Sequence, residues 1–178
     1  MQMNLIGTPK TKEEFDFMFK AYCVYFEEQL KAVCDSFCES GAKYRALYDA
    51  AAYSLEAGGK RIRPVLAFEM CRVCGGDPCD ALPAAIAIEM IHTFSLIHDD
   101  LPCMDNDDIR RGRPSCHKAH GEAVALLAGD VLTAYAGKVI CDSNLSADKK
   151  AAMIQVLYDR TIGMIEGQTI DIDGNFDT

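Results

Sequence analysis

The residues best able to do chemistry gather in one stretch, from Glu89 to Gly112. It reads EMIHTFSLIHDDLPCMDNDDIRRG and contains five aspartates, followed by Arg110 and Arg111. Carboxylates this concentrated repel one another unless a cation joins them. Mg²⁺ prefers oxygen ligands and shares its coordination shell with substrate phosphates, and a guanidinium group matches phosphate oxygens. The stretch therefore predicts a magnesium–diphosphate site.

The spacing of the acids requires an irregular backbone. A helix would place four of the residues on one face: Glu89, His92, Leu96 and Asp99. Pro102 interrupts that helix, because proline cannot donate a backbone hydrogen bond and clashes with the preceding turn. Asp99 and Asp105 therefore cannot lie on one regular helix. We expect an irregularity at Leu101–Pro102 that brings Asp105 back beside Asp99.

A second cluster of cations precedes this stretch. It reads GGKRIRP from Gly58 to Pro64, and Pro64 suits the first turn of a helix. Glycines and three cations at the mouth of a helix could bind an anion, because free N–H groups, the helix dipole and basic side chains coincide there. A solvated loop fits the same residues, so this pattern alone leaves both interpretations open.

Six helices are predicted to carry these residues, and no strand-like alternation of any length is found. Apolar residues recur at steps of three and four along each helix, and Thr11 is a suitable N-cap for the first. The predicted ranges are Lys12–Cys38, Lys43–Ala57, Pro64–Cys74, Asp80–Asp100, Glu122–Cys141 and Ala147–Gly167. The polar segment Asn106–His120 is predicted to be a loop. We therefore expect an all-α protein.

Length and charge narrow the class of protein. A chain of 178 residues is expected to form one domain, residues 1–178, with a real core. The net charge of −9 and the lack of a basic stripe argue against nucleic-acid binding. The first residues have no signal-peptide pattern, and no apolar run approaches the roughly 18 residues of a membrane span. We expect a cytoplasmic protein without a membrane span.

The nine cysteines are interpreted as reduced thiols. Cys71, Cys74 and Cys79 follow a C-x2-C-x4-C pattern that could suggest zinc. No second ligand cluster follows at the spacing of a zinc finger, and the remaining cysteines are scattered. Small core thiols in a reducing compartment explain them better.

Taken together, the motifs resemble those of the trans-isoprenyl diphosphate synthases, or polyprenyl synthetases. The resemblance is closest to bacterial farnesyl and geranylgeranyl diphosphate synthases and concerns the N-terminal portion of the family. The matching residues, in the family's order, are Gly58-Gly59-Lys60-Arg61-x-Arg63-Pro64, Glu89-x-x-His92, Asp99-Asp100-x4-Asp105, Arg110-Arg111-Gly112, His117, Gly129-Asp130 and Gly167-Gln168-x-x-Asp171. The resemblance implies an all-α isoprenoid synthase bundle around a central cavity, here incomplete, and a homodimer.

The resemblance also implies roles for these residues. Mg²⁺ is expected on Asp99 and Asp105. The residues expected to bind isopentenyl diphosphate are Lys60, Arg63, His92 and Arg111. The allylic diphosphate is expected on Arg110, Asp99 and Asp100, with Asp100 as a supporting or water-mediated ligand. The cavity is expected to be lined by Phe94, Ser95, Gln168 and Asp171.

The implied enzyme is a prenyltransferase that condenses isopentenyl diphosphate with dimethylallyl or geranyl diphosphate. A bulky Phe94 favours farnesyl diphosphate as the product, with geranylgeranyl diphosphate as the alternative. On an ideal helix Phe94 points well away from the face of Asp99, so it would have to reach the cavity from the side.

Other polar residues are given structural roles. We expect His98 to be a structural neighbour of Asp99, His117 to support the site, and Asp130 to be a buried, hydrogen-bonded acid. Asp107 and Asp108 are expected to be solvated or supporting acids.

One departure from the family pattern is important. The family's second aspartate-rich motif, D-D-x-x-D, and the lysine before it are absent from these residues. We therefore expect the 178 residues alone not to turn over. A truncated, non-catalytic diphosphate-binding subunit is the main alternative. A metal phosphohydrolase would need histidines upstream of His92, and a terpene cyclase would not need the set Lys60, Arg63 and His92.

Overall fold

The protein is a bundle of α-helices in the computed structural model, which describes residues 9–39 and 44–174. Short elements are a 3₁₀ turn and a hairpin of two-residue strands. The elements in chain order are α1 (Lys12–Glu39), α2 (Arg45–Leu55), α3 (Ile62–Val73), η2 (Pro78–Ala81), α4 (Leu82–Asp99), β1 (Ile109–Arg110), β2 (Arg113–Pro114), α5 (Cys116–His120), α6 (Glu122–Asp142) and α7 (Ala147–Asp173). The all-α class predicted from the sequence is confirmed.

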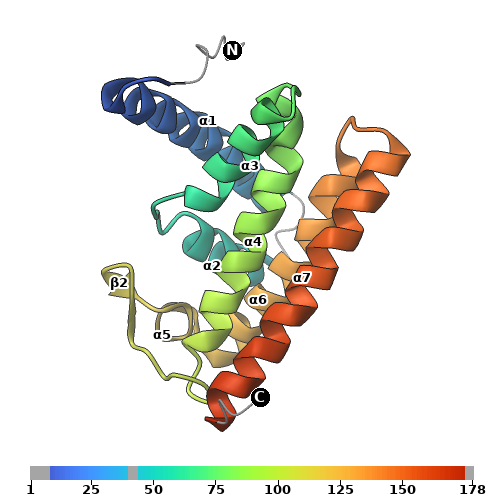
Figure 1. Cartoon of the computed structure of the whole chain (residues 1–178). Helices are drawn as coiled ribbons and strands as arrows, with labels where there is room; N and C mark the ends of the chain where they lie inside the picture. Colours follow the sequence, from blue (N-terminus) through green and yellow to red (C-terminus); the bar gives the residue numbers. More distant parts are fainter. Residues whose placement is uncertain (1–8, 40–43, 175–178) are drawn as a thin grey trace.

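Helix α4 lies at the centre of the bundle, with α1, α2 and α3 to its left and α7 to its right in Figure 1, and α6 packs against both α4 and α2. Its sequence explains this position, because it is apolar around most of its circumference and such a helix is buried. Its buried apolar residues are Ala85, Ile86, Ala87, Met90, Ile91, Phe94 and Ile97. The carboxyl end of α4 lies beside the β1–β2 hairpin and α5 (Figure 1).

Close packing between α4 and α6 depends on small residues. Ala125, Ala128 and Ala136 of α6 are fully buried. At Gly129, an added Cβ would lie 2.2 Å from Nε2 of His98 on α4. The small-residue face of α6 thus lets the two helices approach until a side chain of α4 touches the α6 backbone.

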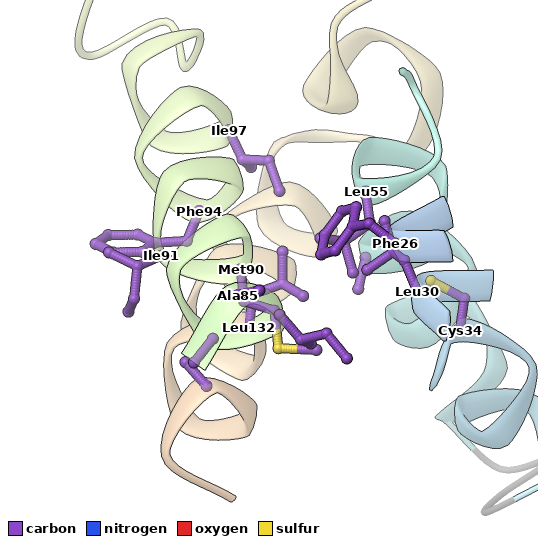
Figure 2. Packing of buried hydrophobic residues seen from close by; sticks show 14 of the residues in the cluster. Phe26, Leu30, Cys34, Leu55, Ala85, Met90, Ile91, Phe94, Ile97 and Leu132 are labelled. Atoms are coloured by element: carbon purple, nitrogen blue, oxygen red, sulfur yellow. The ribbon is translucent and has the colours of Figure 1, made fainter. Parts of the chain in front are cut away.

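Helix α1 covers the other side of the core with an amphipathic face. Tyr22, Phe26 and Leu30 are buried at steps of four residues, and the Tyr22 ring stacks on Phe68 of α3 at 5.3 Å. Figure 2 shows Phe26 and Leu30 grouped with Leu55 of α2. The predicted N-cap is confirmed, since the backbone N–H of Glu14 donates to Oγ1 of Thr11 at 3.2 Å.

Two predictions about secondary structure were wrong. The segment Asn106–His120 is not only a loop, because it contains the hairpin and the single-turn helix α5. Its strands are too short to produce a recognisable alternation. Helix α7 also continues through Gly167 to Asp173, since one exposed glycine weakens a helix by only about 1 kcal/mol. The predicted start at Lys43 lies outside the described residues.

The apolar runs are longer than expected. Helices Pro78–Asp99 and Glu122–Asp142 are long and apolar enough, by length and composition, to cross a membrane. The most apolar 18-residue segments of these two helices are 56% and 39% buried inside the protein. A buried core helix can have the same length and composition as a membrane-spanning helix. Mutual packing of α4 and α6 accounts for their composition, and the absence of a membrane span stays a prediction.

Candidate active site

The carboxyl end of α4 turns back on itself and brings Asp105 to Asp99. The helix ends at Asp99, and the backbone N–H of Asp105 donates to the carbonyl oxygen of Asp99 at 2.8 Å. A second bond, from Asn106 to the Leu101 carbonyl at 3.1 Å, closes the same turn. Burial and then the nearby Asp105 charge raise the pKa of Asp99. The predicted irregularity at Leu101–Pro102 is therefore present.

This acidic turn fits a hard cation. Asp105 is exposed and Asp99 is half-buried, so both carboxylates can be reached. Within residues 9–39 and 44–174, no three His, Cys, Asp or Glu side chains converge as a complete metal site. Mg²⁺ is commonly held by one or two carboxylates together with substrate phosphates and water. Asp99 and Asp105 match that incomplete donor set.

Asp100, next in the chain, is turned into the interior. It is only 1% exposed and accepts a hydrogen bond from Nε of Arg110 at 2.9 Å. Nη2 of Arg110 also contacts Asp100 and lies 3.3 Å from Oδ2 of Asp107. These carboxylates hold the pKa of Arg110 above its usual value, chiefly through the Asp100 hydrogen bond. Asp100 thus anchors Arg110 above the acidic turn.

Arg111 points to a different place from its neighbour. Its guanidinium group donates to the carbonyl oxygen of Gly58, and its Nη2 lies 3.4 Å from Nε2 of His92. Gly59 forms the floor, because a Cβ there would lie 3.1 Å from the guanidinium carbon. Arg111 has a left-handed backbone, φ +53°, in the turn between β1 and β2. The hairpin turn therefore separates two sequence-adjacent arginines.

Positive charge accumulates around His92. Burial and the charge of Arg63 lower the pKa of His92, and Arg111 adds to the effect. Partial burial and nearby arginines likewise lower the pKa of Arg111. Lys60 is exposed on the loop that leads into α3. The positive charges of these side chains repel one another and lower the pKa values of His92 and Arg111. A bound anion would therefore stabilise this cluster.

Arg61 does not belong to this cationic surface, although it lies within the GGKRIRP motif. It is 3% exposed; its Nη1 donates to Glu89 at 2.6 Å and its Nε to Glu27 at 2.7 Å. Its Nη2 donates to the Leu55 carbonyl at 2.9 Å. Arg61 instead ties α1, α2 and α4 together beneath the loop. The sequence pattern did not assign this role, because one motif contains both inward and outward arginines.

A cavity of about 240 Å³ begins at the acidic turn and lies between α4 and α7. Its lining is Phe94, Ser95, His98, Asp99, Met104, Met164, Ile165, Gln168, Thr169 and Ile172. Figure 2 shows Phe94 and Ile91 on the side of α4 away from Leu55. Phe94 and Ser95 thus lie on the same cavity, and Phe94 is 7% exposed.

Asp171 was also expected to share this cavity, and that expectation stays a prediction. Gln168 lines the cavity, but Asp171 is not part of the lining and is exposed. Helix geometry explains the difference. The lining residues of α7 centre on Ile165, Gln168 and Ile172, and at 100° per residue Asp171 falls at the edge of their face.

A wider apolar groove of about 610 Å³ lies farther along α4 and α7. Ile88 and Ile91 of α4 face Val156 and Leu157 of α7 across it. Met164 lines both this groove and the cavity at Asp99. An apolar surface thus extends from the acidic turn into the bundle.

The environments predicted for the remaining polar residues agree with the structure in some cases and differ in others. His98 is a structural neighbour, with Nε2 3.0 Å from the Leu126 carbonyl oxygen. Asp130 is not buried. Its side chain is 60% exposed, because it falls on the face of α6 opposite the buried Ala125, Ala128 and Ala136. Its carboxylate lies 3.9 Å from Nε2 of His98. His117 is buried, and its Nδ1 lies 3.1 Å from Oγ of Ser115. Asp107 and Asp108 are exposed, as expected.

The described residues thus form an all-α bundle with an acidic turn, two separated arginines and an apolar cavity. The chain belongs to the polyprenyl synthetase family, whose model matches residues 44–178. The identification of the family from its motifs is therefore confirmed.

Individual relatives agree. The chain is 53% identical over 133 residues to a farnesyl diphosphate synthase of Geobacillus stearothermophilus, covering 72% of this chain and 45% of that protein. It is 46% identical to chloroplastic geranylgeranyl pyrophosphate synthase 9 of Arabidopsis thaliana, covering 88% and 44%. A solved geranyltransferase from Legionella pneumophila superimposes with a TM-score of 0.81 at 38% identity, covering 88% and 55%. The chain thus spans less than half the length of these two curated relatives.

Proposed function

We propose that this chain takes part in head-to-tail prenyl transfer, in which isopentenyl diphosphate is added to dimethylallyl or geranyl diphosphate. The polyprenyl synthetase family match and the names of its relatives support this chemistry. We further propose that residues 1–178 form part of a single isoprenoid synthase domain. These residues would contribute one wall of its cavity.

One observation supports the proposal: Arg110 and Arg111 are adjacent in sequence, but their side chains contact different parts of the protein. Arg110 is held by Asp100 beside the Asp99–Asp105 turn. Arg111 is held by the Gly58 carbonyl beside His92. A condensation of two diphosphates needs two anion sites side by side, one at an acidic metal-binding turn and one formed by cations alone.

The residues then have distinct tasks. Arg110, with Asp99 and Asp105, would bind the allylic diphosphate, and Mg²⁺ bound by the two aspartates would neutralise the leaving diphosphate. Arg111 and His92, joined by Lys60 and Arg63, would hold isopentenyl diphosphate with its double bond towards the allylic carbon. The carbon–oxygen bond of the allylic diphosphate would break and release diphosphate. A carbon–carbon bond would form to the isopentenyl unit, which would then lose a proton to the released diphosphate.

The apolar cavity supports the same reaction. Its walls would bind the hydrocarbon tail and exclude water, which otherwise would capture the allylic cation. The bulky Phe94 lines the same cavity as Asp99, so we propose farnesyl diphosphate as the product. Geranylgeranyl diphosphate is the alternative, because relatives bearing both names match this chain. Phe94→Ala in a full-length enzyme should lengthen the product, and an unchanged product would place the floor elsewhere.

A non-catalytic diphosphate-binding subunit is the second candidate. It would use the same Arg110–Asp100 and Arg111–His92 contacts for binding alone. In either case we propose pairing with a second synthase chain, as a homodimer for the enzyme. The cytoplasmic location stays a prediction.

The deciding experiment uses the 178-residue chain with geranyl diphosphate, radiolabelled isopentenyl diphosphate and Mg²⁺. We expect both substrates to bind and turnover to be slow or absent. An unpaired acidic wall would neutralise the leaving group only in part, and losing one preorganised electrostatic donor raises a barrier by about 2.7–4 kcal/mol. Turnover comparable to a complete synthase would contradict the expectation. Absence of binding by either diphosphate would contradict the proposed function itself.

A further inference from the structure

The hairpin that carries both arginines is too short to hold its own shape. β1 and β2 contain two residues each, and Arg110 pairs in register with Arg113. A two-stranded hairpin is marginal in water even when longer. Like charges directly opposite each other destabilise it further. Contacts from outside the hairpin must therefore fix its position.

Arg110 and Arg113, which face each other in the hairpin, each contact a different side chain outside it. Arg110 is taken up by the buried carboxylate of Asp100. Arg113 lies over the ring of Tyr53, with its guanidinium carbon 3.5 Å from the ring centroid. This distance is well within the range of a cation–π interaction. The ring of Tyr53 thus relieves the charge repulsion within the hairpin.

Tyr53 also holds the backbone of β2. Its hydroxyl group donates to the carbonyl oxygen of Pro114 at 2.8 Å. The ring of His120 in α5 packs edge-on against it at 4.9 Å. One side chain of α2 therefore contacts both residues of β2 and the helix that follows.

The space beneath the hairpin makes this contact consequential. Tyr53, Arg110 and Arg111 all line one cavity of only about 20 Å³. A cavity of this size has room for about one water molecule. The Tyr53 side chain thus faces the same small space as the two arginines. A smaller residue at this position would enlarge that space and remove the contacts that Tyr53 makes with β2.

We propose that Tyr53 is a positioning residue for diphosphate recognition, holding β2 on α2 so that Arg110 and Arg111 reach their two separate sites. The inference rests on the proposed function for its consequence, but the placement of Arg111 can be measured without any ligand. Removing the Tyr53 side chain should weaken the binding of both diphosphates, whereas removing Arg110 or Arg111 should weaken the binding of mainly one.

His92 provides the ligand-free measurement. The groups that act on its pKa are Arg63, Glu89, Arg111 and Arg61, and of these only Glu89 raises it. If Arg111 moves away, the pKa of His92 should rise, because both a nearby positive charge and part of the burial are removed. The pKa can be followed by ¹⁵N NMR titration of the full chain, with His92→Gln assigning the signal.

The variants are Tyr53→Leu, Tyr53→Phe and the matched control Tyr158→Phe. Tyr158 makes the same type of bond elsewhere, from its hydroxyl group to the Thr133 carbonyl at 3.0 Å. For Tyr53→Leu we expect a raised His92 pKa. We also expect about tenfold weaker binding of isopentenyl diphosphate without Mg²⁺ and of geranyl diphosphate with Mg²⁺. Tyr53→Phe should weaken both by about threefold, and Tyr158→Phe should change neither.

An unchanged His92 pKa in a cooperatively folded Tyr53→Leu variant would overturn the proposal. If that variant does not fold, Arg113→Ala decides, because it removes the cation from the ring and leaves α2 intact. A raised His92 pKa in Arg113→Ala would support the anchor, and an unchanged one would overturn it. If the unsubstituted chain binds neither diphosphate, the proposed function fails, while the His92 titration still tests the role of Tyr53.

Discussion

Arg61 and Glu89 form an ion pair inside the bundle, with Nη1 of the arginine 2.6 Å from Oε1 of the glutamate and side chains 1% and 3% exposed. Glu89 lies one helical turn before His92 and shares its face of α4. The pair therefore lies next to His92 and the cationic surface, and the Glu89 carboxylate is neutralised by Arg61 instead of facing a bound diphosphate.

This pair should be important for stability. Removing one partner of a buried pair leaves an uncompensated charge, so Glu89→Ala should lower the free energy of unfolding by about 3 kcal/mol. Urea denaturation measures the loss. Glu27 is the matched control, since it contacts the same guanidinium at 2.7 Å with a side chain that is 46% exposed. Glu27→Ala should cost within about 1 kcal/mol, and equal losses would contradict the difference in burial.

Glycine substitutions should separate close packing from helix propensity. Gly129→Ala should lower the free energy of unfolding by about 1–3 kcal/mol, because the new Cβ would lie 2.2 Å from His98. Gly163 has no atom within 4 Å of an added Cβ, so Gly163→Ala should stabilise by up to about 1 kcal/mol. Thermal unfolding of both variants is the measurement. A stable Gly129→Ala protein would show that α6 can move away from α4 at little cost.

The acidic turn should give metal-dependent binding. Asp99→Asn should weaken geranyl diphosphate by at least about tenfold in the presence of Mg²⁺, because one of two carboxylates is lost. Calorimetric titration with Mg²⁺ and with EDTA measures this. Asp108→Asn is the control, since Asp108 is exposed and pairs with Lys118 at 2.9 Å. Equal binding by Asp99→Asn and the unsubstituted chain would contradict a metal role for the turn.

The cationic site should bind without metal. Arg63→Ala should weaken the binding of isopentenyl diphosphate by about tenfold, the usual value of a charge-assisted contact. The binding of geranyl diphosphate should not change. Titrations of each ligand separately test this. Arg45→Ala removes an equal charge from an exposed pair with Asp49 and should change neither affinity. Equal weakening of both ligands by Arg63→Ala would argue for one shared site.

Much of the site is predictable from local sequence. Steps of three and four residues place His92 and Asp99 on one face of a helix, and Pro102 requires that helix to end before Asp105. Both inferences depend only on backbone geometry within a few residues. The structure agrees, with α4 ending at Asp99 and the backbone of Asp105 bonded to it.

The destination of each charged side chain was decided by the tertiary structure. Arg61 and Arg63 belong to one motif, yet Arg61 is buried against Glu27 and Glu89 while Arg63 remains exposed. Glu27 is 34 residues away from Arg61 in the chain, so no local sequence pattern predicts the contact between them. Burial of a charge depends on which partners the packed helices bring to it.

The same holds for Arg110 and Arg111. Local spacing shows only two adjacent cations, although the family resemblance implied different substrates for them. In the structure the hairpin directs one to Asp100 and the other to Gly58. The hairpin in turn depends on Tyr53 in α2, 61 residues before Pro114. The sequence by itself determined which chemical groups are available and which helices carry them. Only the packing of distant helices decided where each group points, because a two-residue strand has too few contacts of its own to choose.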